Sequence, residues 1–436
     1  MAKNSARERK KLFQGMNEIV EKDGNNGLKD IYPKALKLLV GASCLSKGEP
    51  NLTGSSATVS LDTLTRFYLQ NHFLVDCARE TDIVAVVGKI CGLHSQLPMT
   101  PYYSLWNRVK GFEAKMLDRL LYKDKRLAKT WFMRGTLHMI PTQEFPMYHN
   151  ALKRMWFEHH GRYMKKPGWP SREEKEDNLY PKVMEALSEK PLRRKELSDR
   201  VRLLLTNEAQ PFERLFSAWG GILKETSYLG LTVYAEPCGR ESCFARLDEW
   251  LPNVNLNTIS EERARQQLLK KYLSCYGPAS SQDFACWSGM LTSEARQIIE
   301  ETKSLRQVRL EGSREELWML KEDFRTLEKA DLEAEVPPRL LPKYDPYLMG
   351  HKNRSRIIRN EMLQKVYRPV VGEVAATVLI NGRIVGTWTS SRTKKVLRIS
   401  VKPLEKFTEK KLSSLRPVAN EFAQFLGVEE AQISLS

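Results

Sequence analysis

The stretch LAKTWFMRGTLHMIP, residues 127–141, contains two apolar runs separated by Arg134-Gly135. Two such runs around a glycine-containing pair are typical of two strands joined by a tight turn. Apolar residues recur at helical spacing in residues 61–74 and 80–96, and residues 112–122 are predicted to form another helix. Helices followed by a two-stranded wing are the element order of a winged helix-turn-helix unit.

The same order of elements recurs twice further along the chain. Residues 177–252 contain helical patterns followed by a predicted hairpin around Cys238–Ser242, and residues 260–327 contain three helices followed by strand, turn and strand. Three units in tandem would place several helices against the major groove or the backbone of DNA. The similarity of sequence between the units is weak, so this prediction rests on the order of elements.

The C-terminal region has a different pattern. β-Branched residues alternate in residues 371–391, and Asn381-Gly382 is the pair that best specifies a two-residue hairpin turn. Residues 409–426 are predicted to close the chain as a helix. The predicted fold class is therefore α+β, with tandem winged helix-turn-helix units followed by a small β-barrel domain.

Five domains are predicted from these patterns. They are a basic N-terminal extension and linker (1–60), winged helix 1 (61–145), a connector with winged helix 2 (146–255), winged helix 3 (256–332) and the β-barrel with its terminal helix (333–436). An accessory helix and a disordered basic arm are both open for the first of them.

Charge is the most distinctive property of the composition. The 436 residues carry a formal net charge of +17. Residues 350–411 contain fifteen basic and four acidic side chains, a local excess of +11. Clustered positive charge favours a polyanionic partner such as nucleic acid, although a solvated basic surface is the alternative.

Several classes of protein are excluded or disfavoured by what the sequence lacks. No run of about 18 apolar residues predicts a membrane span. Residues 1–16 are positively charged but are not followed by an apolar segment, so they are not expected to be a secretory signal. The seven cysteines are scattered and odd in number, which disfavours a disulfide scaffold or a zinc site and suggests the reducing cytosol. Neither a phosphate-binding glycine loop nor a Gly-x-Ser-x-Gly elbow is present.

His94-Ser95-Gln96 is the candidate for chemistry, and it is predicted at the end of the helix 80–96. Polar side chains two residues apart could hold one water molecule between them. The alternative is that they cap the helix or form a satisfied polar pair near the core, since buried polar groups are normally hydrogen-bonded.

Five segments together resemble a known family. They are GLHSQLPMTPYYSLWNRV (92–109), RGTLHMIP (134–141), YGPASSQDFACWSG (276–289), LLPKYDPYLMGHKNR (340–354) and NGRIVGTW (381–388). In this order they resemble the AlkZ/YcaQ-type DNA glycosylases, over about residues 61–430. The resemblance implies three tandem winged helices and a C-terminal β-barrel that enclose duplex DNA.

The resemblance also implies an activity and its residues. The activity is monofunctional hydrolysis, without lyase activity, of the N-glycosidic bond of alkylated or bulky purines, including crosslinks made by genotoxic natural products. The family's catalytic motif is glutamine, an aliphatic residue, then glutamine or aspartate. That motif falls on His94, Ser95 and Gln96: Gln96 matches, and the other two residues differ. The alternative is a non-catalytic winged-helix DNA-binding protein or transcriptional regulator.

A mechanism can be predicted for these residues. Gln96 would hold a water molecule, and His94, with an ordinary pKa near 6.5, would accept its proton. Activity should then fall at acid pH. Neither a metal nor a cofactor is expected.

The expected partner is double-stranded DNA, bound by a monomer with no membrane attachment, in the cytoplasm and associated with the nucleoid. The biological context implied is base excision repair of alkylation damage and self-resistance. The basic residues predicted to contact DNA are Arg134, Lys224, Lys352, Arg354, Arg356, Arg392, Lys394 and Lys395.

Overall fold

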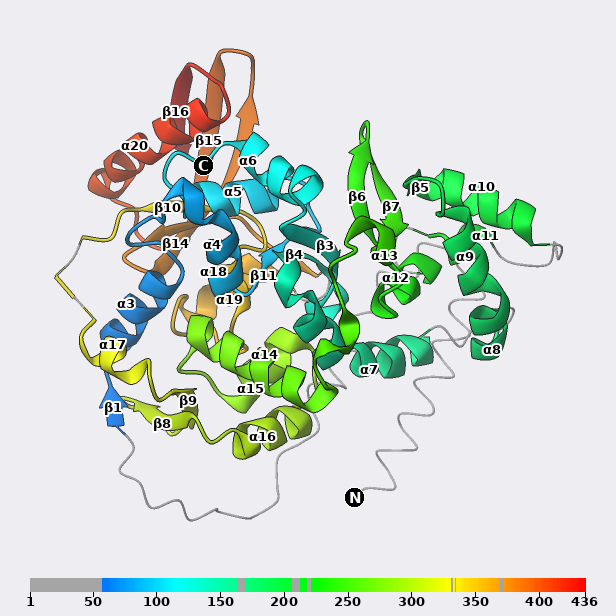
Figure 1. The fold of residues 1–436 in the computed structure, drawn as a ribbon. Coiled ribbons are helices and arrows are strands. Elements are labelled where there is room, and N and C mark those ends of the chain that lie inside the picture. Colours follow the sequence, from blue (N-terminus) through cyan, green and yellow to red (C-terminus); the bar gives the residue numbers. More distant parts are fainter. Residues whose placement is uncertain are drawn as a thin grey trace, which may run out of the picture. The chain divides into compact units, whose positions relative to one another are not determined.

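The structure is a computed structural model (Figure 1). It describes residues 57–163, 169–205, 212–217, 221–330, 332–333, 335–368 and 372–436. Residues Ser56–Asn360 and Ala376–Ser436 form one compact unit, and Glu361–Ala375 belong to a second. Most of the predicted extension 1–60 lies outside the described residues. Of the helices that the structure describes, none is long and apolar enough to cross a membrane.

The first group contains the predicted hairpin, but the helix predicted over residues 80–96 ends at Lys89, and the helix Thr100–Trp106 was not predicted. Ser60 caps the first helix, because its side chain accepts a hydrogen bond from the Thr63 backbone. The helices are α3 (Leu61–Asn71), α4 (Ile83–Lys89), α5 (Thr100–Trp106) and α6 (Ala114–Asp118). Strands β3 (Leu127–Trp131) and β4 (Leu137–Pro141) are antiparallel. A 3-10 turn, Met133–Gly135, joins them.

This hairpin continues into the hairpin of the second group. Strand β6 (Thr232–Cys238) pairs with β7 (Glu241–Arg246), and Lys129 of β3 pairs with Tyr234 of β6. The result is a six-stranded sheet in the order β2-β4-β3-β6-β7-β5, whose outer strands are β2 (Leu93–His94) and β5 (Leu192–Arg193). The two wings therefore form one continuous sheet.

Most helices of the second group contribute apolar side chains to one core. The helices are α7 (Phe145–Tyr163), α8 (Arg172–Glu174), α9 (Tyr180–Ala186), α10 (Arg194–Leu204), α11 (Phe212–Leu215), α12 (Gly221–Tyr228) and α13 (Leu247–Trp250). Val183, Leu197 and Ile222 are fully buried in this core. Two of these helices, α11 and α12, lie within the helical pattern that precedes the predicted hairpin.

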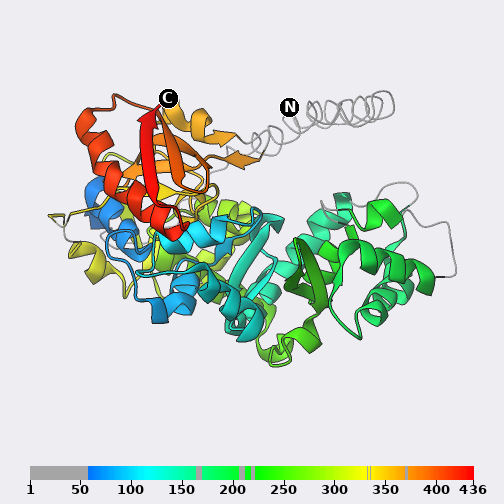
Figure 2. The ribbon, with the colours of Figure 1, turned by 90° about the horizontal axis from the view of Figure 1, so that it is seen from above.

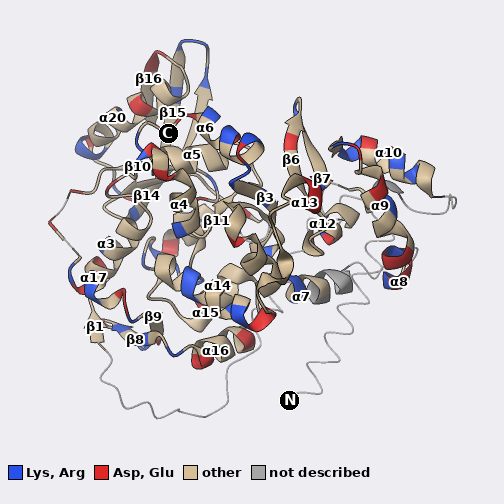
Figure 3. Cartoon of the chain, in the orientation of Figure 1, with Lys and Arg blue, Asp and Glu red and all other residues tan. Residues whose placement is uncertain are grey.

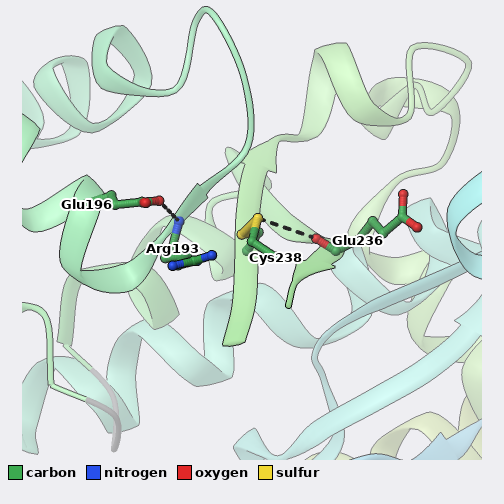
Figure 4. Close-up of a disulfide and its surroundings, with 5 residues drawn as sticks. Arg193, Glu196, Glu236 and Cys238 are labelled. Carbon is green, nitrogen blue, oxygen red and sulfur yellow. Dashed lines mark hydrogen bonds between the residues drawn. A yellow bond between two sulfur atoms is a disulfide. The ribbon is translucent and has the colours of Figure 1, made fainter. Parts of the chain in front are cut away.

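The β6–β7 hairpin also contains a disulfide, Cys238–Cys243, with the two Cα atoms 5.9 Å apart. Figure 4 shows it near Arg193 of β5, whose register partner is Cys243. The spacing of the cysteines in the sequence did not predict this disulfide. The two residues are brought together by the pairing of β6 with β7, and that register could not be derived from the sequence.

The third group follows the predicted order, with one added strand. Its helices are α14 (Glu261–Tyr276), α15 (Ser281–Ser288) and α16 (Thr292–Glu301). Strands β8 (Leu305–Leu310) and β9 (Leu317–Leu320) pair antiparallel, and helix α17 (Phe324–Glu328) follows them. Strand β1 (Ala57–Val59), from the start of the described chain, joins β8 in parallel.

The C-terminal region is a sheet covered by a helix. Its order is β10-β13-β14-β15-β16. The strands are β10 (Arg339–Leu341), β13 (Thr377–Ile380), β14 (Arg383–Arg392), β15 (Val396–Pro403) and β16 (Glu430–Leu435). The predicted Asn381-Gly382 turn joins β13 to β14, with φ of 49° and 75°. Figure 2 shows helix α20 (Glu409–Phe425) lying against this sheet.

The prediction of a closed β-barrel is wrong for this region. Within the described residues β10 and β16 are the two edges of an open sheet. Helix α20 buries the apolar face instead, because Leu415, Ala419 and Phe422 pack against Val378, Leu397 and Ile399. A sheet whose apolar face is covered by a helix has no need of closure.

Short elements complete the description. Helix α18 (Pro346–Met349) follows β10. The second compact unit contains α19 (Leu363–Val366) and the antiparallel pair β11 (Tyr367–Arg368) and β12 (Glu373–Val374). The α+β class is confirmed, with three helix groups that each end in a hairpin. The five domain boundaries stay a prediction.

Candidate active site and DNA-contact residues

His94 lies in a strand, and the prediction that it ends a helix is wrong. Helix α4 ends at Lys89, and β2 then pairs with β4 so that His94 lies opposite His138. The backbone N–H of Ser95 extends the pairing by donating to the Leu137 carbonyl at 2.8 Å. Pairing in a sheet fixes the direction of alternate side chains, so His94 and His138 project from the same face.

Aromatic rings enclose the imidazole of His94. The ring of Tyr344 is stacked on it, with centroids 4.7 Å apart and an interplanar angle of 15°. The ring of His138 lies nearly perpendicular to it, with centroids 5.4 Å apart. His94 is consequently only 4 % exposed.

Two buried polar atoms at this position lack hydrogen-bond partners within the described part of the chain. They are Nδ1 of His94 and Oγ of Ser95. Buried polar atoms are normally satisfied by protein or by ordered water. These two atoms could therefore accept or donate a hydrogen bond to a water molecule or to a substrate atom.

Burial keeps His94 neutral. Burial is the larger cause and the positive charge of Arg134 the smaller one, and together they lower the pKa of His94 to about 3. Burial, His94 and Arg134 together hold the pKa of His138 well below its usual range. A base with so low a pKa accepts protons poorly at neutral pH. The expected pKa near 6.5 is thus corrected, and a hydrogen-bond acceptor is the role that the geometry favours.

Gln96 differs from His94 in exposure. It follows β2 and is exposed, and its Oε1 accepts a hydrogen bond from the Leu137 backbone at 3.4 Å. This contact orients the side-chain amide against β4. Of the two predicted residues, Gln96 exposes its side-chain amide to solvent, whereas the side chain of His94 is buried.

Arg134 was expected to be a DNA contact in a wing turn, but its side chain is directed into the protein. Its φ is 55°, and its guanidinium donates to the backbone carbonyl of Trp287. The side chain is half-buried, and burial lowers its pKa. Its charge acts on His94 and His138 as described above.

The other predicted DNA contacts fall into three groups by exposure. Lys352, Arg392, Lys394 and Lys395 are exposed; Lys224 and Arg354 are half-buried; Arg356 is buried. Three of the exposed residues lie at the turn between β14 and β15, where Figure 3 shows a patch of basic residues. This turn is the most accessible cationic feature of the predicted set.

Burial gives two of these residues partners inside the protein. Arg356 donates to the Pro278 carbonyl at 2.8 Å, and its guanidinium lies 4.0 Å from Asp283 and 3.9 Å from Glu315. Lys224 lies over the Tyr228 ring at 5.9 Å, and burial lowers its pKa to about 8. These contacts favour structural roles for both side chains.

Sequence reasoning missed His138 and Tyr344. Both lie in segments quoted for the resemblance, but nothing in the local pattern connects them to His94. The alternation of β4 could have suggested that a histidine in the middle of a wing strand faces a neighbouring strand. Within the described residues no group of three or more His, Cys, Asp or Glu side chains is arranged to hold a metal ion.

Known proteins share this arrangement of elements. A family model described as "DNA glycosylase AlkZ-like" matches residues 87–425. The "Interstrand DNA cross-link repair glycosylase" of Streptomyces sahachiroi is 25 % identical over 319 residues, which cover 70 % of this chain and 81 % of that protein. The solved structure of the Streptomyces sahachiroi DNA glycosylase AlkZ matches with a TM-score of 0.73 at 24 % identity, covering 87 % of this chain and 100 % of that chain.

Proposed function

Because this chain belongs to the AlkZ-like DNA glycosylase family, we propose that it hydrolyses the N-glycosidic bond of alkylated or bulky purine adducts in duplex DNA. Interstrand cross-links are included, since the Streptomyces sahachiroi relative is named for their repair. The observation that carries the proposal is the pairing of exposed Gln96 with buried, neutral His94 at one strand end.

The chemistry of the bond explains why such weak bases are sufficient. Glycosidic hydrolysis passes through an oxocarbenium-like sugar. When the C1′–N bond breaks, the electron pair goes to the purine, which an alkyl group at N7 has already made cationic. Water then bonds to C1′ and releases a proton to solvent. The protein must hold that water on the sugar face opposite the base.

Gln96 and His94 suit that task. The amide of Gln96 can both donate to a water molecule and accept from it. Nδ1 of His94 is without a partner among the described residues and can accept a second hydrogen bond. A neutral imidazole also avoids the repulsion that a protonated one would exert on the sugar cation.

The strand register supports hydrolysis without lyase activity. A lyase needs an amine that attacks C1′, and Lys129 of β3 is the lysine of this hairpin. Burial lowers the pKa of Lys129 to about 8. Lys129, however, shares its row with Met139 and Leu93, whereas His94 shares its row with His138 and Thr130. Adjacent rows project from opposite faces of a sheet.

Binding to DNA is proposed to use the exposed basic turn between β14 and β15, with the protein acting as a monomer on chromosomal DNA in the cytoplasm. The second candidate function is a non-catalytic DNA-binding protein. The small exposure of His94 favours it, because a ring that is 4 % exposed offers little surface to a substrate.

The test uses duplexes carrying N7-methylguanine or a bulky N7-guanine adduct. Each duplex is incubated with protein and heated in alkali, which cleaves DNA at abasic sites. We expect cleavage with wild type and a loss of about 10²-fold or more in Gln96→Ala and His94→Ala. Gln424→Ala, an exposed glutamine on α20, is the matched control and should be unchanged.

Two further outcomes separate the alternatives. Strand breaks that appear without alkali, or a borohydride-trapped covalent complex, would contradict hydrolysis without lyase activity. Tight DNA binding by wild type without cleavage of either adduct would contradict the glycosylase function and support the second candidate, a non-catalytic DNA-binding protein.

A further inference from the structure

We propose that Tyr344 is a positioning residue for His94: its ring lies along one face of the imidazole, orients it and shields that face from bulk water. This inference rests on the proposed function, in which His94 orients the attacking water. Tyr344 follows β10, and His94 lies in β2, so distant parts of the chain meet here.

The contact geometry supports orientation of the ring. Tyr344 lies nearly parallel to His94, at 15°, and His138 lies nearly perpendicular, at 77°. The backbone of His94 is fixed by its pairing with β4. An imidazole bounded by a face, an edge and a strand has little freedom to rotate about its side-chain bonds.

Both chain neighbours of Tyr344 are anchored to α5 and the two residues that follow it. Oγ1 of Thr100 donates to the Lys343 carbonyl at 3.0 Å. Oγ of Ser104 donates to Asp345 at 2.8 Å. The guanidinium of Arg108 binds the same carboxylate at 2.9 and 2.6 Å.

The backbone of Tyr344 shows that this anchoring holds the residue in an unfavourable conformation. Its φ is 58°, in the left-handed region that large side chains seldom adopt. Such conformations persist where the surrounding contacts determine them, and they concentrate at functional sites. The anchored segment therefore holds the tyrosine ring where His94 needs it.

The charged and titratable groups around His94 predict what removal of the ring does. Arg134 from the 3-10 turn and His138 from β4 face it along with Tyr344. Burial is the main cause of the low pKa of His94. Water that enters in place of the Tyr344 ring would restore part of the hydration of the protonated form, so the pKa of His94 should rise.

The experiment compares Tyr344→Phe, Tyr344→Leu and Tyr344→Gly with wild type. The first keeps the aromatic face, and the last two remove it. Glycine also adopts a positive φ without strain, so it serves if the leucine variant does not fold. Tyr122→Leu, at another half-buried tyrosine, is the matched control.

The first readout is the titration of His94 by NMR with 13C-labelled histidine, assigned with His94→Gln. We expect its midpoint to stay near 3 in wild type, Tyr344→Phe and Tyr122→Leu. In Tyr344→Leu and Tyr344→Gly it should move above about 5, toward the ordinary value. An unchanged titration in both variants would overturn the proposal, whatever their thermal stability.

The second readout is the rate on the N7-methylguanine duplex between pH 5 and 8. Tyr344→Leu should lose about 10- to 100-fold at pH 7.5 and lose more as the pH falls, whereas Tyr344→Phe should retain activity. The titration needs no substrate. Inactivity of wild type on every adduct would therefore refute the proposed function, while the midpoint still decides whether Tyr344 shields His94.

Discussion

Replacement of Asp345 by alanine should destabilise the protein strongly. The side chains of Asp345 and Arg108 are both completely buried, and their charges face each other. Asp345 accepts hydrogen bonds from Ser104, from two nitrogens of Arg108 and from the backbone N–H of Tyr347. Removal of one partner leaves a buried charge without compensation, which costs about 3–5 kcal/mol.

Urea unfolding followed by circular dichroism measures this loss. The midpoint should fall while the slope with urea stays unchanged, because the surface exposed on unfolding is the same. Glu176→Ala is the control. It breaks the Arg172–Glu176 pair, whose side chains are 74 % and 43 % exposed, and it should cost less than about 1 kcal/mol.

A double variant tests the cause. Arg108→Met with Asp345→Leu removes both charges, and replacement of a buried pair by apolar side chains is often close to neutral. It should therefore recover most of the stability lost in Asp345→Ala. The reasoning is refuted if Asp345→Ala costs less than about 1 kcal/mol, or if the double variant is no more stable than the single one.

Three more predictions concern acid stability, packing and DNA affinity. The pKa of His94 is depressed in the folded state, so its contribution to the free energy of unfolding is present above pH 6.5 and is lost as the pH falls toward 3. At pH 4.5 this loss is about 3 kcal/mol. The difference in unfolding free energy between wild type and His94→Gln should therefore change by that amount between pH 7.5 and pH 4.5. Gly350→Ala would push a Cβ into the Tyr276 ring and should lower the unfolding free energy by about 1–3 kcal/mol. The control, Gly312→Ala, has open space around the new Cβ but a φ of 72°, and should cost about 1 kcal/mol. Equal losses in the two variants would contradict the packing argument. Alanine at the three basic residues of the β14–β15 turn (Arg392, Lys394 and Lys395) should reduce the slope of log Kd against log salt by up to about 3 in fluorescence anisotropy, and an unchanged slope would exclude contact of this turn with phosphates.

Local signals predicted the elements that local interactions determine. The first of the three helices predicted in residues 260–327 begins after Ser260, a residue type that favours a helix start, and the Ser260 side chain accepts a hydrogen bond from the Arg263 N–H. The turn at Asn381-Gly382 was expected because both residues tolerate a positive φ. The hairpin around Arg134-Gly135 was predicted from the two apolar runs that flank a glycine-containing pair, and its two strands pair as expected.

Interactions between distant segments were not predictable in this way. The short strand at His94 exists because β4 pairs with it, and a two-residue strand carries no pattern of its own. The stacking of Tyr344 on His94 depends on how the C-terminal region packs against α5. Arg356 has the composition of a surface cation, but the arrangement of Pro278 and Asp283 around it makes it a buried donor.

The parallel pairing of β1 with β8 has a consequence for biosynthesis. Ala57 has Val308 as its register partner, and about 250 residues of chain separate the two. At ~5–20 residues per second, β1 emerges from the ribosome roughly 10–50 s before the strand that it joins. The order of synthesis therefore differs from the order of assembly. The sheet of the third group is completed by β1, a strand that is synthesised before the helices of the first group. Deletion of the residues up to 60 would remove a strand from that distant sheet rather than shorten a tail.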